Sequence, residues 1–150
     1  MSLLILFNGI PPPTLQTFPL ADLWYFLPFG YLLTILIETP ILFFGLSPKV
    51  SVKQKVLFGI WLTACTYPIV VLVLPTIFFG ASRNLYLLIA ETFAPIAECS
   101  LFLLSVRGKG ILGTPDWLRC FAAIIVANLA SFGVGEVLNM FEWLGLFYDL

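Results

Sequence analysis

The sequence contains no histidine and few charged residues of either sign. Of its 150 residues, 10% are Asp, Glu, Lys or Arg, whereas 61% are hydrophobic. A soluble domain carries about a quarter charged residues, because such side chains make up much of its water-facing surface. The composition therefore excludes a soluble globular domain and predicts an integral membrane protein of one domain.

The missing histidine also limits the chemistry. It excludes imidazole metal ligands, histidine ligation of haem and histidine-based catalysis. With seven basic and eight acidic residues the net charge is −1, which provides no field to attract nucleic acid. The three cysteines, Cys65, Cys99 and Cys120, are odd in number and lie within apolar runs, so we expect free thiols. The sequence identifies no cofactor and no metal site.

Four apolar segments are long enough to cross a bilayer as helices, which takes roughly 20 residues each. They lie at about 23–46, 56–79, 85–106 and 117–140, within a transmembrane domain over 23–150. The preceding segment, 1–22, is apolar, is interrupted by three consecutive prolines and has no basic residue. A cleaved signal peptide needs a basic start, so we predict an interfacial segment here instead.

The basic residues predict the orientation of the chain, because Lys and Arg are retained in cytoplasmic loops. The second connection holds Arg83 alone, and the two terminal segments hold no basic residue. The first and third connections hold Lys49, Lys53, Lys55, Arg107 and Lys109. Both termini are therefore predicted on the non-cytoplasmic side of the membrane.

The two halves of the chain resemble one another at their polar positions. In each half a glutamate lies near the end of one span, and two polar residues three apart, followed by an aromatic residue, lie in the next. The equivalent positions are Glu38 and Glu98, Thr63 and Asn128, and Thr66 and Ser131. This pattern favours an all-α fold of four transmembrane helices, arranged as two hairpins of the same orientation that arose by duplication. Chance similarity between apolar helices is the alternative.

Half of the acidic residues lie inside the predicted spans. A charged side chain at the centre of such a helix costs about 2.5–3.5 kcal/mol, so these carboxyls are the candidate ion- or proton-binding residues. They are Glu38, Glu91, Glu98 and Glu136. Supporting polar side chains are predicted at Thr63, Thr66, Tyr67, Asn128 and Ser131. A rise of about 1.5 Å per residue places Glu136 and Glu91 outermost, the hydroxyl and amide groups between, and Glu98 and Glu38 innermost.

Small residues recur every four positions along the fourth span. They are Ala123, Ala127, Ser131 and Gly135. A stripe of this kind lets helix backbones approach closely in a membrane. We therefore expect the fourth span to pack closely against its neighbours at the centre of the bundle.

These features favour a membrane protein that binds or conducts a proton or a small cation. The alternative is a non-catalytic accessory subunit of a larger membrane complex, because the loops are too short to hold a catalytic domain. An intramembrane enzyme is disfavoured, since the aspartates lie at span ends and histidine is absent. The expected partners are the lipid bilayer and either further copies of the chain or a larger complex, with no nucleic acid.

Overall fold

A computed structural model describes residues 20–78, 81–107 and 112–140, and all regular structure within these ranges is helical. The elements are α1 (Leu20–Gly45), α2 (Val52–Pro68), the π-helical turn η3 (Ile69–Val73), α3 (Leu74–Ile77), α4 (Arg83–Val106) and α5 (Thr114–Met140). Helix α1 already begins at Leu20, so the end of the predicted interfacial segment is helical. The rest of that segment lies outside the described residues.

Four helical stretches among the described residues are long and apolar enough to cross a membrane, as predicted. They are Leu27–Gly45, Val52–Ile77, Asn84–Val106 and Thr114–Leu138. The second begins earlier than predicted, because Ser51 accepts a hydrogen bond from the backbone N–H of Gln54 while the Gln54 side chain accepts one from Ser51. Lys53 and Lys55 therefore lie in the first turn of α2 rather than in a loop.

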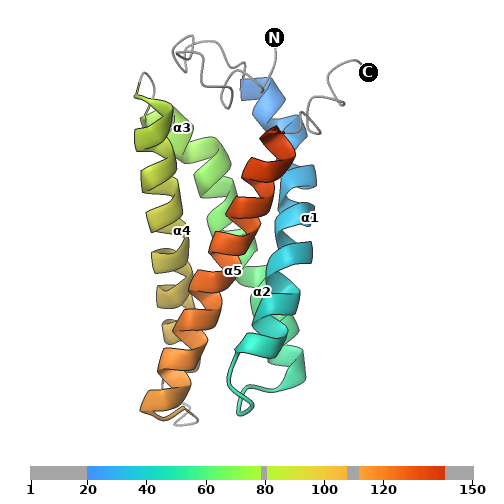
Figure 1. The fold of residues 1–150 in the computed structure, drawn as a ribbon, viewed down its shortest axis with the longest axis vertical. Coiled ribbons are helices and arrows are strands. Elements are labelled where there is room, and N and C mark those ends of the chain that lie inside the picture. The colour runs from blue at the N-terminus through green and yellow to red at the C-terminus, as the bar shows by residue number, and fades with distance from the viewer. Residues whose placement is uncertain (1–19, 79–80, 108–111, 141–150) are drawn as a thin grey trace.

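The helices form an elongated bundle in which α1 lies against α2 and α5, and α4 lies against the same two helices (Figure 1). The start of α1 and the end of α5 lie at one end of the bundle. The apolar core fills the opposite half. It comprises Leu42, Leu46, Val50, Phe58, Leu62, Phe102, Val106, Cys120, Ala123, Ile124 and Ala127. Large apolar side chains such as Leu36, Phe44 and Leu104 face outward, as expected of a surface in contact with lipid.

The small-residue stripe of α5 packs closely along its first half only. A Cβ atom added at Gly45 of α1 would lie 2.6 Å from the Cβ of Ala123, so the two helices are nearly in backbone contact there. Ala127 is fully buried. Gly135, by contrast, has no neighbouring atom within 4 Å of an added Cβ, because it lines a cavity instead.

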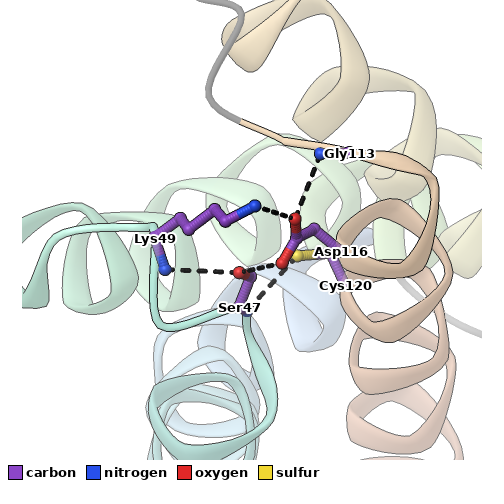
Figure 2. A network of polar contacts seen from close by, with 5 residues as sticks. All are labelled: Ser47, Lys49, Gly113, Asp116 and Cys120. Atoms are coloured by element: carbon purple, nitrogen blue, oxygen red, sulfur yellow. Dashed lines mark hydrogen bonds and ion pairs between the residues drawn. The ribbon is translucent and has the colours of Figure 1, made fainter.

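The connection between α1 and α2 is joined to the start of α5 by a polar network (Figure 2). The carboxylate of Asp116 accepts hydrogen bonds from Ser47 Oγ at 2.6 Å, Lys49 Nζ at 2.7 Å and the Gly113 N–H at 3.1 Å. The Ser47 N–H donates to Cys120 Sγ at 3.4 Å. Asp116 lies in the first turn of α5, where a negative charge also interacts favourably with the helix dipole. These contacts hold this end of the bundle together.

Two basic side chains cap the C-terminus of α1 from neighbouring helices. Lys55 Nζ donates to two carbonyl oxygens at 3.2 and 3.0 Å, and the Arg119 guanidinium donates to two others at 2.8 and 3.1 Å. The four carbonyls belong to Phe43, Leu46, Gly45 and Phe44. The last carbonyls of a helix have no partner within it, so α2 and α5 each satisfy part of this need.

Candidate functional site

Glu38 of α1 is buried among three helices, with 2% of its surface exposed. The Thr63 hydroxyl of α2 lies 2.7 Å from Glu38 Oε2, and the Ser131 hydroxyl of α5 lies 2.7 Å from Glu38 Oε1. Both oxygens of this carboxyl therefore have a hydrogen-bond partner, each from a different helix. Such complete pairing offsets part of the cost of removing a carboxyl group from water.

Glu98 of α4 is equally buried, with 1% of its surface exposed. Thr66 Oγ1 of α2 lies 2.8 Å from Glu98 Oε1, and Asn128 Nδ2 of α5 donates to Glu98 Oε2 at 2.8 Å. Asn128 Nδ2 also donates to the Ile124 carbonyl at 3.0 Å. Because this nitrogen faces two acceptors, the orientation of the amide is fixed. The same two helices, α2 and α5, thus hold both buried glutamates.

A cavity of about 200 Å³ lies beside these carboxyls, between α1, α2, α4 and α5. All nine candidate residues from the sequence line it. They are Glu38, Glu91, Glu98, Glu136, Thr63, Thr66, Tyr67, Asn128 and Ser131. The structure therefore brings the candidate side chains together around one space.

Four of the predicted supporting side chains bond directly to the two buried carboxyls. They are Thr63 and Ser131 at Glu38, and Thr66 and Asn128 at Glu98, so the side chains meet although the Cα positions predict separate depths. The reason is that side chains in a helix tilt toward its N-terminus. Helices α1 and α4 run opposite to α2 and α5 (Figure 1), so the two sets of side chains tilt toward each other. A depth calculated from Cα positions alone omits this convergence.

Sequence reasoning missed Tyr86 and the irregular helix beside it. After Pro68, which has no N–H to bond the carbonyl of Ala64, the chain continues as the π-helical turn η3. The Tyr86 hydroxyl of α4 donates to the Val70 carbonyl in this turn at 3.0 Å. Tyr86 and Val70 both line the cavity. Pro68, together with Pro75 just after the turn, was the signal in the sequence for this break, and π-helical turns recur at functional sites.

Within the ranges that the structure describes, no three side chains of the types His, Cys, Asp or Glu lie close enough together to hold a metal ion. Glu38 and Glu98 are held by donors from hydroxyl and amide groups instead. A hydroxyl can donate to a carboxylate or accept from a protonated carboxyl, so these partners fit either protonation state of the two glutamates.

Replacing Asn128 by leucine, which has the same number and branching of side-chain heavy atoms, is expected to destabilise the bundle by about 1 kcal/mol, because Glu98 Oε2 loses its donor. Reversible unfolding in mixed detergent micelles measures the change. Ser100→Ala is the control, since the exposed Ser100 hydroxyl bonds only to Ile96 of its own helix. An equal loss of stability in both variants would show that the bond to Glu98 contributes nothing.

Comparison of the chain with protein-family models, with curated proteins and with solved structures finds no match in any of the three. The function is therefore inferred from the residues and their geometry alone.

Proposed function

We propose that this chain is a four-span membrane protein that binds and conducts a proton or a small cation through Glu38 and Glu98. One observation carries the proposal: two almost fully buried carboxyls lie beside a cavity inside the bundle. Ionisable groups inside a membrane are costly to bury, and they mark ion pathways and proton relays when they face a cavity.

The hydrogen bonds around Glu38 suit reversible protonation. Thr63 Oγ1 lies 2.7 Å from Glu38 Oε2 and 2.9 Å from the Gly59 carbonyl, but a hydroxyl has one proton for these two acceptors. When Glu38 is ionised, the hydroxyl donates to the carboxylate. When Glu38 is protonated, the carboxyl donates to the hydroxyl, which then donates to the carbonyl. Both states are therefore satisfied without moving a heavy atom.

The other two hydroxyls have the same arrangement. Ser131 Oγ lies 2.7 Å from Glu38 Oε1 and 2.9 Å from the Asn128 carbonyl. Thr66 Oγ1 lies 2.8 Å from Glu98 Oε1 and 3.1 Å from the Leu62 carbonyl. Glu38 can therefore carry its proton on either oxygen, whereas Glu98 carries it on Oε1, since Asn128 Nδ2 facing Oε2 can only donate. The two glutamates therefore differ in proton exchange, since Glu38 can use either oxygen and Glu98 only one.

We also propose that the two hairpins are a duplicated unit. Buried positions recur sixty residues apart between residues 30–46 and α4, and sixty-five residues apart between α2 and α5. The pairs are Gly30 and Ala90, Glu38 and Glu98, Leu42 and Phe102, Leu46 and Val106, Phe58 and Ala123, Gly59 and Ile124, Leu62 and Ala127, and Thr63 and Asn128. Each glutamate has one partner in its own hairpin and one in the other, at equivalent positions. These regularities support a parallel repeat.

The position of the apolar core indicates from which side of the membrane a proton or cation reaches the buried glutamates. The apolar core fills the half of the bundle nearest the α1–α2 connection, and the cavity lies toward the end at which α1 begins and α5 finishes. With both termini on the non-cytoplasmic side, as the basic residues predict, the glutamates face that side and the core separates them from the cytoplasm. Conduction then requires the core to open.

The test is proton flux into liposomes that contain the purified protein and carry an imposed pH gradient. Glu38→Gln and Glu98→Gln are expected to reduce the flux to the level of empty liposomes, because an amide cannot exchange the proton. Thr92→Val is the control, since the exposed Thr92 hydroxyl bonds only to Leu88 of its own helix. Flux that persists unchanged in both glutamine variants would refute the proposal.

The alternative, an accessory subunit, has a separate test. Extraction in mild detergent followed by native electrophoresis compares the size of the native particle with that of the purified chain. A monomer or simple dimer counts against the alternative. A much larger particle, together with no flux from the isolated chain, counts in its favour.

A further inference from the structure

We infer that the cavity beside Glu38 and Glu98 binds a small organic cation, a protonated or quaternary amine, against its aromatic wall. This inference rests on the proposed function, because it assigns to the same carboxyls an occupant other than the proton. It depends on the size of the cavity, the side chains of its wall and the sign of its charge.

The cavity has the size and the lining of a site for a small molecule. Its volume is about 200 Å³, and an apolar protein cavity of about 150 Å³ is large enough for benzene. The space exists because three of the surrounding helices carry small residues there, namely Gly30, Ala90, Ala94 and Gly135. Most of the wall surface is apolar, and the polar groups include the four carboxyls and the hydroxyl and amide groups that bond to the two buried glutamates, a combination found in sites for small ligands.

Three aromatic side chains contribute to the wall, namely Tyr67 of α2, Tyr86 of α4 and Phe132 of α5. The hydrogen bond from Tyr86 to the Val70 carbonyl fixes the position of its ring. Tyr67 packs against Tyr31, with ring centroids 6.2 Å apart. Aromatic faces attract alkylammonium groups, and the attraction is strongest where water is excluded. An aromatic wall inside a membrane bundle therefore favours an organic cation over a hydrated inorganic ion.

The charge of the cavity favours the same class of ligand. Four carboxyl groups line it, from Glu38, Glu91, Glu98 and Glu136, whereas none of the described lining residues is basic. When ionised, these groups would repel an anion, and a neutral apolar molecule would gain no electrostatic attraction from them. An organic cation satisfies both features, since its charge faces the carboxylates and its alkyl groups contact the aromatic and aliphatic wall.

The probe is choline, and its control is the uncharged isostere in which a carbon atom replaces the ammonium nitrogen. Titration calorimetry of the purified wild-type protein in detergent is expected to show saturable choline binding, with the isostere at least about tenfold weaker. Glu98→Gln and Tyr67→Leu are each expected to weaken choline binding by about tenfold. Tyr67→Phe, which keeps the aromatic face, should retain it. Trp61→Leu should also retain it, because Trp61 lies on the outer surface and does not line the cavity.

Equal affinity for choline and its isostere, or no saturable binding of choline, would overturn the inference without the use of any variant. Unchanged binding in both Glu98→Gln and Tyr67→Leu would also overturn it. The results also distinguish a failure of this inference from a failure of the proposed function. Proton flux that depends on Glu38 and Glu98 without choline binding refutes only the inference. Choline binding that depends on Glu98 and Tyr67, without flux of any ion, supports the inference and refutes conduction.

Discussion

The Phe102→Ala variant is expected to lose about 3 kcal/mol of stability, which is at the low end of the range for such substitutions in soluble cores. Phe102 is fully buried in α4, and its ring packs edge-on against Phe58 of α2 and Trp117 of α5, with centroids 4.9 and 6.0 Å away. Its removal opens a void where three helices meet. The low end applies because helix association within a bilayer depends on packing rather than on exclusion of water.

Leu104→Ala is the matched control for this prediction, because Leu104 lies on the same helix with 67% of its surface exposed. Truncation of the Leu104 side chain should leave the free energy of unfolding nearly unchanged. Unfolding of both variants in mixed micelles gives the two free energies. A similar loss of stability in both variants, or a negligible loss in Phe102→Ala, would mean that the core between α2, α4 and α5 is not closely packed in the detergent-solubilised protein.

The contrast between Phe102 and Leu104 also shows what the sequence could predict of the fold. Each span is identified by its run of apolar residues, and a helix long and apolar enough to cross a membrane lies at each of the four positions, with the second beginning earlier than predicted. In a bilayer both the interior and the lipid-facing surface are apolar, so the pattern does not distinguish a buried residue from an exposed one. The contacts between helices therefore could not be predicted, apart from those marked by small residues such as Ala123 and Ala127.

In contrast to the apolar contacts between helices, the glutamates of the candidate site could be predicted from the sequence. A glutamate within an apolar span is conspicuous because of its cost, so Glu38 and Glu98 could be selected from the sequence alone. Their hydrogen-bond partners could not be assigned, since Thr66 bonds to Glu98 of a different hairpin and not to Glu38. The cavity could not be predicted either, because it depends on which small residues of different helices, such as Ala90 and Gly135, line the same space.

Gly59→Ala is expected to cost about 2 kcal/mol and to disturb the carboxylate site as well. A Cβ atom at Gly59 would lie 2.5 Å from Thr39 Oγ1 and 2.8 Å from Thr39 Cα, and the second contact is with backbone that cannot rotate away. Helix α1 must therefore move away from α2. Thr39 directly follows Glu38, and the Gly59 carbonyl accepts from the Thr63 hydroxyl. The same movement thus lengthens the 2.7 Å contact between Thr63 and Glu38.

Gly133→Ala supplies the control, since a Cβ atom there meets nothing within 4 Å and alanine is the better helix former. This variant should be as stable as the wild type or slightly more so, with unchanged flux. Unfolding and proton flux are measured for both variants. If Gly59→Ala matched Gly133→Ala in both measurements, α1 and α2 could not be in close contact, and the geometry proposed to hold the Glu38 proton would be wrong. A loss of flux in Gly59→Ala, under conditions in which the variant remains folded, would connect helix packing directly to the chemistry of the buried carboxyl.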